Sequence, residues 1–290
     1  MSSGRFAPSP SGDLHVGNLR TALLAWLFAR STDREFLMRI EDLDRVRPGA
    51  EQKQLDDLRA IGLDWDGEIV RQSERRGLYE DAIDRLTDAG RVYPCFCSRR
   101  EIREAPSAPH TPRGTYPGTC RDLTESERER RSAARPAALR LRTDVDEWTI
   151  TDALHGTYTG TVDDVVLRRN DGVPAYNLAV VVDDDEQGID QVVRGDDLLT
   201  SAPRQAYLAT LLGQEPPMYA HVPLALNTSG DRLAKRDGAV TRTELQSHGV
   251  DVLALMAESL GLVGPTPREM LTSFEPDRLP REPWTFVPPA

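Results

Sequence analysis

The chain has 290 residues, which is enough for one large domain or two modest ones with a sizeable core. A net charge of −11 argues against broad nonspecific nucleic-acid binding while allowing a local basic patch, and no apolar run approaches a membrane span. The start lacks a signal pattern and the three cysteines are too few for a disulfide framework, so we expect a reducing, cytoplasmic location and no membrane partner.

A short buried strand, a turn built from Pro, Ser and Gly, and an almost wholly apolar helix follow one another between residues 5 and 30. This order is typical of phosphate-binding sites, because free backbone N–H groups and the helix dipole face the mouth of the loop. Gly12 and Gly17 allow a ligand to approach the backbone, and His15 and Asn18 add side-chain donors. Neither a P-loop nor a dinucleotide fingerprint is present.

A second buried strand is predicted over residues 34–40, and it ends in the carboxylate Glu41. Carboxylates at the carboxyl end of a parallel strand lie at the ligand edge of an open α/β sheet, although a helix cap or a solvated charge would explain Glu41 equally well. Helices over 48–60 and 74–89, with a turn over 61–65 between them, complete a βαβα pattern. The pattern predicts the first half of a doubly wound domain.

The composition changes in residues 95–135, which contain nine arginines and six acidic residues in an otherwise acidic protein. All three cysteines, Cys95, Cys97 and Cys120, lie in this segment. They could be reduced thiols of an irregular loop, but a loop with so little apolar content needs a constraint that a structural zinc would supply. A closed zinc site requires four ligands, and ligand chemistry by itself favours His110 as the fourth.

Strands of a small antiparallel layer are predicted over 138–142 and 162–169, followed by a hairpin turn. A mostly apolar strand over 173–182, which contains Tyr176, then resumes the parallel domain. A glycine-flanked strand ending near Arg194 and a helix over 197–212 follow. Taken singly, Tyr176 and Arg194 would each be interpreted as an ordinary structural or surface residue.

The segment after residue 226 reads as a mobile glycine-flanked loop. It contains Lys235, one of only two lysines beside 34 arginines, and the two cations are not interchangeable. From Gly264 onward, seven prolines in 27 residues predict an extended, irregular tail.

Several of these segments resemble the conserved blocks of a known enzyme family. Residues 5–20 resemble the HIGH signature of class I aminoacyl-tRNA synthetases in its glutamyl form, and RLAKR at 232–236 resembles their KMSKS loop, with Arg232 and Ala234 off pattern. Three further blocks are similar to glutamyl-synthetase segments in the same order: MRIEDLDRVR at 38–47, GVPAYNLAVVVDD at 172–184 and QVVRGDDLL at 191–199. Because the chain leaves no room for anticodon-binding domains and carries the cysteine insert, it resembles the glutamyl-Q tRNA(Asp) synthetase branch.

The resemblance implies a class I Rossmann-type, doubly wound parallel sheet with an inserted zinc-containing α+β subdomain and a short helical and extended C-terminal region. We expect the first Rossmann half at residues 1–92, the insertion at 93–172, the second half at 173–228, and the KMSKS-like loop with a helical segment and tail at 229–290.

The family's activity implies an ATP-dependent ligase that forms glutamyl-adenylate and transfers glutamate to queuosine in the anticodon stem-loop of tRNA(Asp). A compact glutamyl-tRNA synthetase acting on tRNA(Glu), or a non-catalytic tRNA-binding paralogue, is the alternative.

The family's motifs assign glutamate binding to Arg5, Ser9, Glu41, Tyr176 and Arg194, catalysis to His15, Asn18 and Lys235, and binding of ATP with Mg²⁺ to these three and Gly17. They also imply that Zn²⁺ is held by Cys95, Cys97, Cys120 and Tyr116, so that Tyr116 replaces His110.

Overall fold

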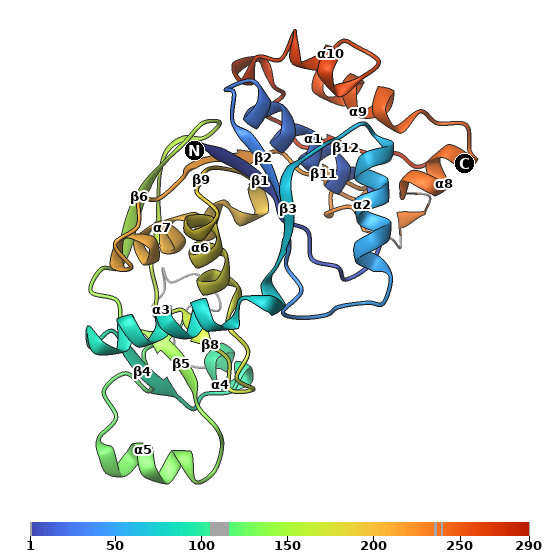
Figure 1. Cartoon of the computed structure of the whole chain (residues 1–290). Helices are drawn as coiled ribbons and strands as arrows, with labels where there is room; N and C mark the ends of the chain where they lie inside the picture. The colour runs from blue at the N-terminus through green and yellow to red at the C-terminus, as the bar shows by residue number, and fades with distance from the viewer. Residues whose placement is uncertain (1, 105–115, 235–236, 239, 290) are drawn as a thin grey trace.

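The computed structural model of the chain describes residues 2–104, 116–234, 237–238 and 240–289. Its main body is built on a mostly parallel sheet, and a small lobe extends from one end of it (Figure 1). Within the described ranges, no helix has both the length and the apolarity that crossing a membrane requires.

The central sheet explains where a ligand could bind. In the described residues its strand order is β3 (Asp66–Arg71), β2 (Glu35–Ile40), β1 (Ser3–Phe6), β9 (Ile189–Gly195), β10 (Met218–Val222), β6 (Glu147–Asp152) and β7 (Gly156–Thr161). Neighbouring strands run parallel as far as β6, and β7 returns antiparallel as a hairpin. Because β1 lies between β2 and the much later β9, the strand order reverses at β1, and ligands bind at the carboxyl ends of strands beside such a reversal.

Helices cover both faces of the sheet because its strands are apolar on both sides. On β9, Val193 packs into the cluster formed around α1 (Val16–Arg30), whereas the adjacent Val192 packs with residues of α7 (Ala202–Leu211). Successive residues of a strand point to opposite faces, so this alternation places α1 and α7 on opposite sides. Most of α1 is buried, as its uniform apolarity predicts.

The small lobe contains the predicted antiparallel layer. Strands β4 (Val92–Cys95), β5 (Ala138–Leu141) and β8 (Val166–Arg168) pair antiparallel, so the strands expected at 138–142 and 162–169 are neighbours as predicted. The domain division stays a prediction, since β6 and β7 lie within 93–172 yet join the large sheet. The remaining helices of this lobe are α3 (Arg76–Asp88), α4 (Arg99–Glu104) and α5 (Glu125–Ser132).

The C-terminal region packs back on the main body instead of forming only the irregular tail that its prolines predict. Strand β12 (Trp284–Thr285) pairs parallel with β11 (Ala225–Leu226), and Phe28 contacts Phe274 with ring centroids 5.3 Å apart. The helices of the C-terminal region are α8 (Arg242–Ser247), α9 (Val252–Leu260) and α10 (Pro267–Leu271). Helix α2 (Ala50–Ala60), from the first half of the chain, lies beside α8 (Figure 1).

One predicted element is wrong. Residues 173–182 were expected to form a strand, but helix α6 (Tyr176–Glu186) begins at Tyr176. Residues 178–184 are all buried, so α6 lacks the polar face that gives a helix its 3.6-residue periodicity. A short, valine-rich run of this kind has the same pattern as a buried parallel strand.

A buried carboxylate joins α6 to the first half of the chain. Asp183 is fully buried and accepts hydrogen bonds from Gln72 Nε2 at 2.7 Å, Arg75 Nε at 2.7 Å and the Tyr79 hydroxyl at 2.9 Å. Its charge also lies 3.9 Å from Arg39 Nε. All three donors converge on this one buried acceptor, so its removal would leave them without that partner and Asp183 is a structural residue of the fold.

We predict that Asp183→Ala lowers the free energy of unfolding by about 3–5 kcal/mol, because it leaves buried cations and donors without their partner. Denaturant unfolding of the purified variant measures this. Asp56→Ala is the matched control: its ion pair with Arg59 is exposed, and its loss should change stability by less than about 0.5 kcal/mol. Equal effects of the two substitutions would contradict the structural role.

Candidate active site

The start of α1 is closed by a reciprocal pair of hydrogen bonds. His15 is the N-cap residue: its Nδ1 accepts from the Asn18 backbone N–H at 3.2 Å, while its own N–H donates to Asn18 Oδ1 at 3.2 Å. Because Nδ1 is the acceptor, the proton of the neutral imidazole is on Nε2, which makes Nε2 a donor. A Cβ on Gly17 would lie 2.9 Å from that of Ala225, so only glycine permits this close packing.

The loop between β1 and α1 is anchored through its backbone. Gln54, buried on α2, donates from Nε2 to the carbonyl oxygens of Ser9 at 3.0 Å and Gly12 at 2.6 Å. The Glu41 N–H donates to the Pro8 carbonyl at 3.0 Å, which ties the loop to the end of β2. The exposed Ser9 is therefore presented by a loop whose backbone is already held in place.

Arg5 and Glu41 belong to a buried group of alternating charges. Arg5 Nε donates to Asp184 Oδ1 at 3.2 Å, and Arg39 bridges Asp184 at 2.8 Å and Glu41 at 3.6 Å. Burial raises the pKa of Glu41, while Arg39 and Arg5 act against that rise. Although burial alone would raise it, the two arginines lower the pKa of Asp184. Of the two carboxylates, Asp184 is already compensated by arginines, whereas the charged form of Glu41 would be stabilised further by an added cation.

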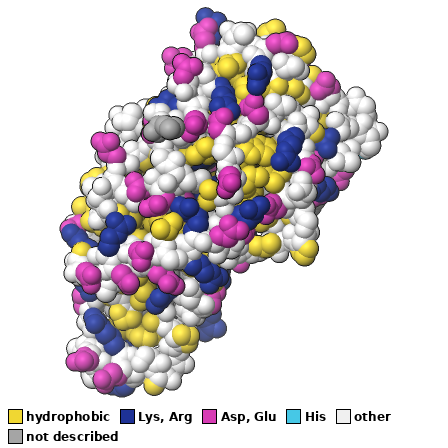
Figure 2. Space-filling model, in the orientation of Figure 1, with side chains coloured by type: hydrophobic (Ala, Val, Ile, Leu, Met, Phe, Trp, Pro, Cys, Tyr) yellow, Lys and Arg dark blue, Asp and Glu magenta, His cyan; other side chains and the backbone are white. Residues whose placement is uncertain are grey.

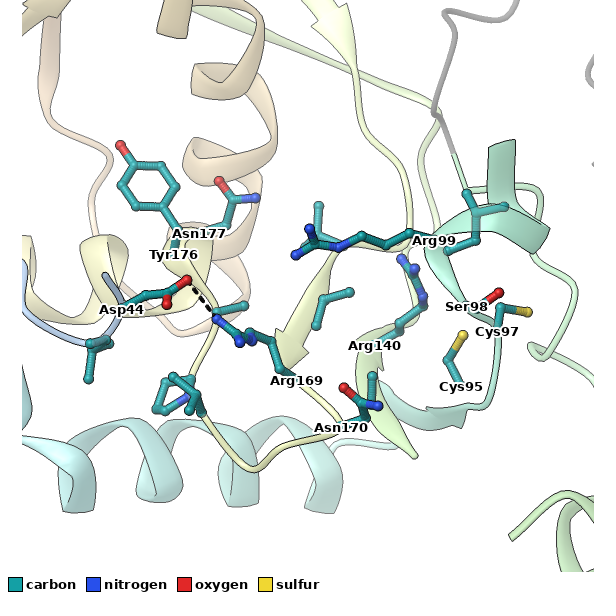
Figure 3. Close-up of a pocket in the computed structure, with 18 of the residues that line it drawn as sticks. Asp44, Cys95, Cys97, Ser98, Arg99, Arg140, Arg169, Asn170, Tyr176 and Asn177 are labelled. Atoms are coloured by element: carbon teal, nitrogen blue, oxygen red, sulfur yellow. Dashed lines mark hydrogen bonds and ion pairs between the residues drawn. The ribbon is translucent and has the colours of Figure 1, made fainter. Parts of the chain in front are cut away.

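Tyr176 and Arg194 reach the same edge of the sheet from α6 and the end of β9. Tyr176 is 41% exposed as a whole residue, and its hydroxyl points away from the cysteine end of the cleft (Figure 3). Removal from water, followed by the charge of Glu41, raises the pKa of this phenol, and the Arg194 and Arg5 guanidinium groups oppose the rise. Arg194 is buried, and its Nε donates to His221 Nε2 at 3.0 Å.

The KMSKS-like loop starts and ends beside the N-terminus of α1. Lys235 and Arg236 lie outside the described residues. Before them, the Leu233 N–H donates to the Ala225 carbonyl at 3.1 Å, and after them Val240 accepts from the Val16 N–H at 2.8 Å. His15 also forms a β-bridge with Thr241. The base of the loop is therefore close to the capped helix start, and the off-pattern Arg232 forms an ion pair with Asp197.

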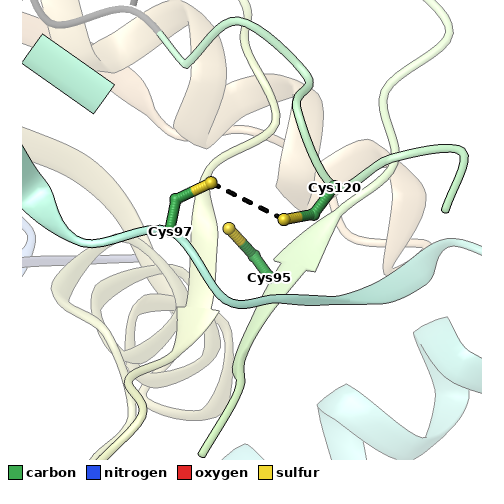
Figure 4. A group of neighbouring side chains, drawn as sticks. All are labelled: Cys95, Cys97 and Cys120. Atoms are coloured by element: carbon green, nitrogen blue, oxygen red, sulfur yellow. Dashed lines mark hydrogen bonds between the residues drawn. The ribbon is translucent and has the colours of Figure 1, made fainter. Parts of the chain in front are cut away.

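The three cysteines converge, as Figure 4 shows, although Cys120 is distant in sequence. Their sulfur atoms all lie within 4.8 Å of one another, with Cys97 Sγ and Cys120 Sγ 3.6 Å apart. Sulfur ligands of a tetrahedral zinc ion are about 3.8 Å apart for a Zn–S bond of about 2.3 Å, so this spacing fits a metal ion. His110 lies outside the described residues.

Tyr116 lies against the cysteine cluster. Its hydroxyl donates to Cys95 Sγ at 3.3 Å and accepts from the Cys120 N–H at 2.8 Å. The Arg140 guanidinium carbon lies 3.6 Å from the centre of the Tyr116 ring. Although burial would raise it, the Tyr116 hydrogen bond and then the charge of Arg140 lower the pKa of the Cys95 thiol. The phenol oxygen is therefore near enough to join the cysteines around a cation.

A cleft of about 820 Å³ extends from Glu41 and Tyr176 to the cysteine cluster. Figure 3 shows Tyr176 at one end, the cysteines at the other and arginines between them. Ser9 and Glu41 line the Tyr176 end, whereas His15, Gly17 and Asn18 are not among its described lining residues. Basic and acidic side chains are interspersed on the surface shown in Figure 2, but the described lining of the cleft is locally basic. It contains six arginines and three carboxylates: Arg45, Arg99, Arg135, Arg140, Arg169, Arg204, Glu41, Asp44 and Asp163.

The described residues that the sequence predicts for the site therefore fall into three groups: those expected to bind glutamate, at or near the Tyr176 end of the cleft, the capped start of α1, and the cysteine cluster. Sequence reasoning missed Arg39, Asp184, His221 and Asp152, which support the first group from behind. The signal that could have found them is a charged or polar residue at or beside the end of an otherwise apolar element.

The whole chain is similar to known proteins of one kind. The family model "tRNA synthetases class I (E and Q), catalytic domain" matches residues 3–281. The chain is 68% identical to a glutamyl-Q tRNA(Asp) synthetase of Nocardia farcinica, over 98% of this chain and 93% of that one. It is 55% identical to a protein of the same name from Cutibacterium acnes, over 90% and 76% of the two chains.

A solved structure has the same fold. The glutamate tRNA ligase of Elizabethkingia meningosepticum, in complex with its amino acid, superposes with a TM-score of 0.82 at 27% identity, over 99% of this chain and 67% of that one. The synthetase-type parallel sheet expected from the sequence is thereby confirmed. The chain belongs to the class I tRNA synthetases of the E and Q type, and within them to the family of glutamyl-Q tRNA(Asp) synthetases.

Proposed function

We propose that this protein activates L-glutamate with ATP and transfers it to the queuosine of tRNA(Asp). The observation that carries the proposal is the pairing of charges at the Tyr176 end of the cleft. Glutamate has two carboxylates and one ammonium. Glu41 lines this end of the cleft, and Arg5 and Arg194, although they are not among its described lining residues, lie near enough for their charges to act on the Tyr176 phenol. Ser9 and Tyr176 supply polar contacts between them.

The roles follow from the charges of the substrate. Arg5 and Arg194 bind its carboxylates, and Glu41, whose burial favours a cationic partner, binds its ammonium. Such a site prefers glutamate to glutamine, because an uncharged amide would leave an arginine without its anion.

Activation needs no protein base, since the substrate carboxylate is already a nucleophile. An oxygen of the α-carboxylate attacks the α-phosphorus of ATP, the bond from that phosphorus to the bridging oxygen breaks, and pyrophosphate leaves. Mg²⁺, when bound with ATP, would supply further charge neutralisation. His15 Nε2 and the α1 N-terminus stabilise the phosphates; Gly17 keeps this end accessible, and Asn18 fixes the N-cap residue His15 through the reciprocal hydrogen bonds. Lys235 neutralises the charge that develops on pyrophosphate. A hydroxyl of queuosine then attacks the glutamyl carbonyl, and AMP departs.

The choice of acceptor is supported by the activity that gives the family its name, and by the arginines lining the cleft beyond Tyr176. These could contact phosphates of an anticodon stem-loop. We also propose that residues 93–172 form the acceptor-binding insertion between the halves at 1–92 and 173–228, before the C-terminal region at 229–290.

We further propose that Cys95, Cys97, Cys120 and Tyr116 hold a structural Zn²⁺. The sulfur spacing and the position of the Tyr116 hydroxyl support this donor set. The ion would stabilise a segment with few apolar residues, and it takes no part in the chemistry.

The function is tested with ATP, labelled glutamate and separate tRNA(Asp) pools with and without queuosine. Because this chain carries the proposed glutamate and ATP contacts, glutamate-dependent exchange of pyrophosphate into ATP should occur without tRNA. Label should enter only the queuosine-containing pool. Exchange that requires tRNA(Glu), with label entering that tRNA, would favour a compact glutamyl-tRNA synthetase, and a complete lack of exchange would favour a non-catalytic paralogue.

Glu41→Gln should weaken glutamate binding while leaving the KM for ATP nearly unchanged. Removing the charged partner of a buried ammonium costs about 2–5 kcal/mol, which raises the KM for glutamate at least roughly 30-fold. Since burial raises the pKa of Glu41, protons compete with the ammonium, so the wild-type KM for glutamate rises as pH falls. The variant should lose that component of the pH dependence.

The control for this substitution is Asp44→Asn, which removes an exposed carboxylate of the same cleft that pairs with Arg169 at 2.9 Å. Its KM for glutamate should stay within about twofold of wild type, because an exposed pair contributes little. An unchanged KM in Glu41→Gln would remove Glu41 from the amino-acid site.

The purified protein should contain about one zinc per chain, and Cys97→Ser should lose it and expose the insert to hydrogen exchange. Metal analysis and exchange mass spectrometry measure the two effects. Tyr116→Phe should weaken zinc retention against a chelator, whereas Tyr93→Phe, which removes a phenol bonded to Asp164, should not. Zinc retained in Tyr116→Phe but lost in His110→Ala would make His110 the fourth ligand.

A further inference from the structure

A polar chain runs behind the proposed glutamate site, across the carboxyl ends of three adjacent parallel strands. Arg194 on β9 lies opposite His221 on β10, and Asp152 ends the next strand, β6. Arg194 Nε donates to His221 Nε2 at 3.0 Å, and His221 Nδ1 lies 2.6 Å from Asp152 Oδ2. All three side chains are buried.

The chemistry of the three groups permits one arrangement of protons. A guanidinium can only donate, so His221 Nε2 must accept from Arg194. The imidazole proton is then on Nδ1 and is donated to the Asp152 carboxylate. Burial together with the neighbouring Arg194 charge keeps the pKa of His221 below its usual range despite Asp152, in agreement with a neutral ring.

Asp152 is itself fixed, which makes the orientation of His221 rigid. Its Oδ1 accepts the backbone N–H groups of Leu154 at 2.9 Å and His155 at 3.0 Å, and its Oδ2 accepts the His221 N–H at 3.1 Å. The His221 ring also stacks on Tyr219, with centroids 5.8 Å apart and planes 21° from parallel.

Arg194 depends on this histidine for its position. The hydrogen bond from its Nη2 to the Leu198 carbonyl is long at 3.4 Å, and its guanidinium carbon lies 5.5 Å from the centroid of the Tyr219 ring. The bond to His221 is therefore the best-defined constraint on the guanidinium. Like Arg194 itself, His221 and Asp152 are not among the described residues that line the cleft.

We propose that His221, oriented by Asp152, is a positioning residue that holds the Arg194 guanidinium ready for a carboxylate of the amino-acid substrate. This inference rests on the proposed function, in which Arg194 binds glutamate. Its effect is on substrate affinity: without the acceptor at Nε2, Arg194 must be ordered by glutamate itself, and ordering one long side chain costs about tenfold in affinity.

Two substitutions of His221 distinguish its hydrogen bond with Arg194 from its hydrogen bond with Asp152. In His221→Asn the amide nitrogen replaces Nδ1, which keeps the bond to Asp152 and removes the acceptor for Arg194. In His221→Gln the amide oxygen replaces Nε2, which keeps the acceptor for Arg194 and removes the donor to Asp152. His155→Asn is the matched control, since the His155 side chain contacts the His221 carbonyl and not Arg194.

Glutamate-dependent pyrophosphate exchange at varied glutamate and varied ATP provides the readout. We expect His221→Asn to raise the KM for glutamate about tenfold with the KM for ATP and kcat little changed, His221→Gln to stay within about threefold of wild type, and the control to be unaffected. Thermal melting identifies any variant that fails to fold. If His221→Asn fails, Asp152→Asn, which keeps His221, should raise the KM for glutamate selectively.

Distinct outcomes overturn the inference and the function on which it rests. A wild-type protein without glutamate-dependent exchange would overturn the proposed function. A wild-type protein that exchanges normally, with an unchanged KM for glutamate in a folded His221→Asn or Asp152→Asn, would overturn only the positioning role. Parallel changes in the KM for glutamate, the KM for ATP and kcat, or equal effects of the Asn and Gln substitutions of His221, would likewise reduce His221 to a structural residue.

Discussion

The fold depends on a buried exchange of charges between its two halves. Asp183 and Asp184, at the end of α6, face Arg5 from β1, Arg39 from β2 and Arg75 beside α3. Arg5 and Asp184 are 179 residues apart in sequence. Such a network forms only when all its members are present, because each charge is buried where only an opposite charge or a hydrogen bond can compensate it.

The same network prepares the substrate site. Arg39 divides its contacts between Asp184 and Glu41, so Glu41 is held at the sheet edge without being fully neutralised. On the other side, Arg194 is held by a neutral histidine. The groups proposed to bind the carboxylates and the ammonium of the substrate are thus ordered before any ligand arrives, and a ligand need not supply the cost of ordering them.

The secondary-structure elements around the site could be predicted from the sequence where they depend only on residues that are neighbours in the chain. The turn of Pro, Ser and Gly before His15, the apolar α1 and the strand ending at Glu41 are local patterns, and the structure contains each of them. Helix α6 was misassigned because burial on all sides removed its periodicity. Strand β3 was missed because its residues are half exposed and contain glycine and charges, which suit a turn as well as an edge strand.

By itself, the sequence determined the enzyme class and the succession of the first two strands and the helix between them, and it predicted the candidate site residues, because motifs and periodicities are properties of contiguous residues. Only the tertiary structure decided that Arg39, Asp184, His221 and Asp152 stand behind those contacts, and that Cys120 and Tyr116 approach Cys95. These relations join residues that are distant in the chain. They arise from how the strands are ordered in the sheet and how the helices pack against it, and no local pattern encodes a hydrogen bond between two such residues.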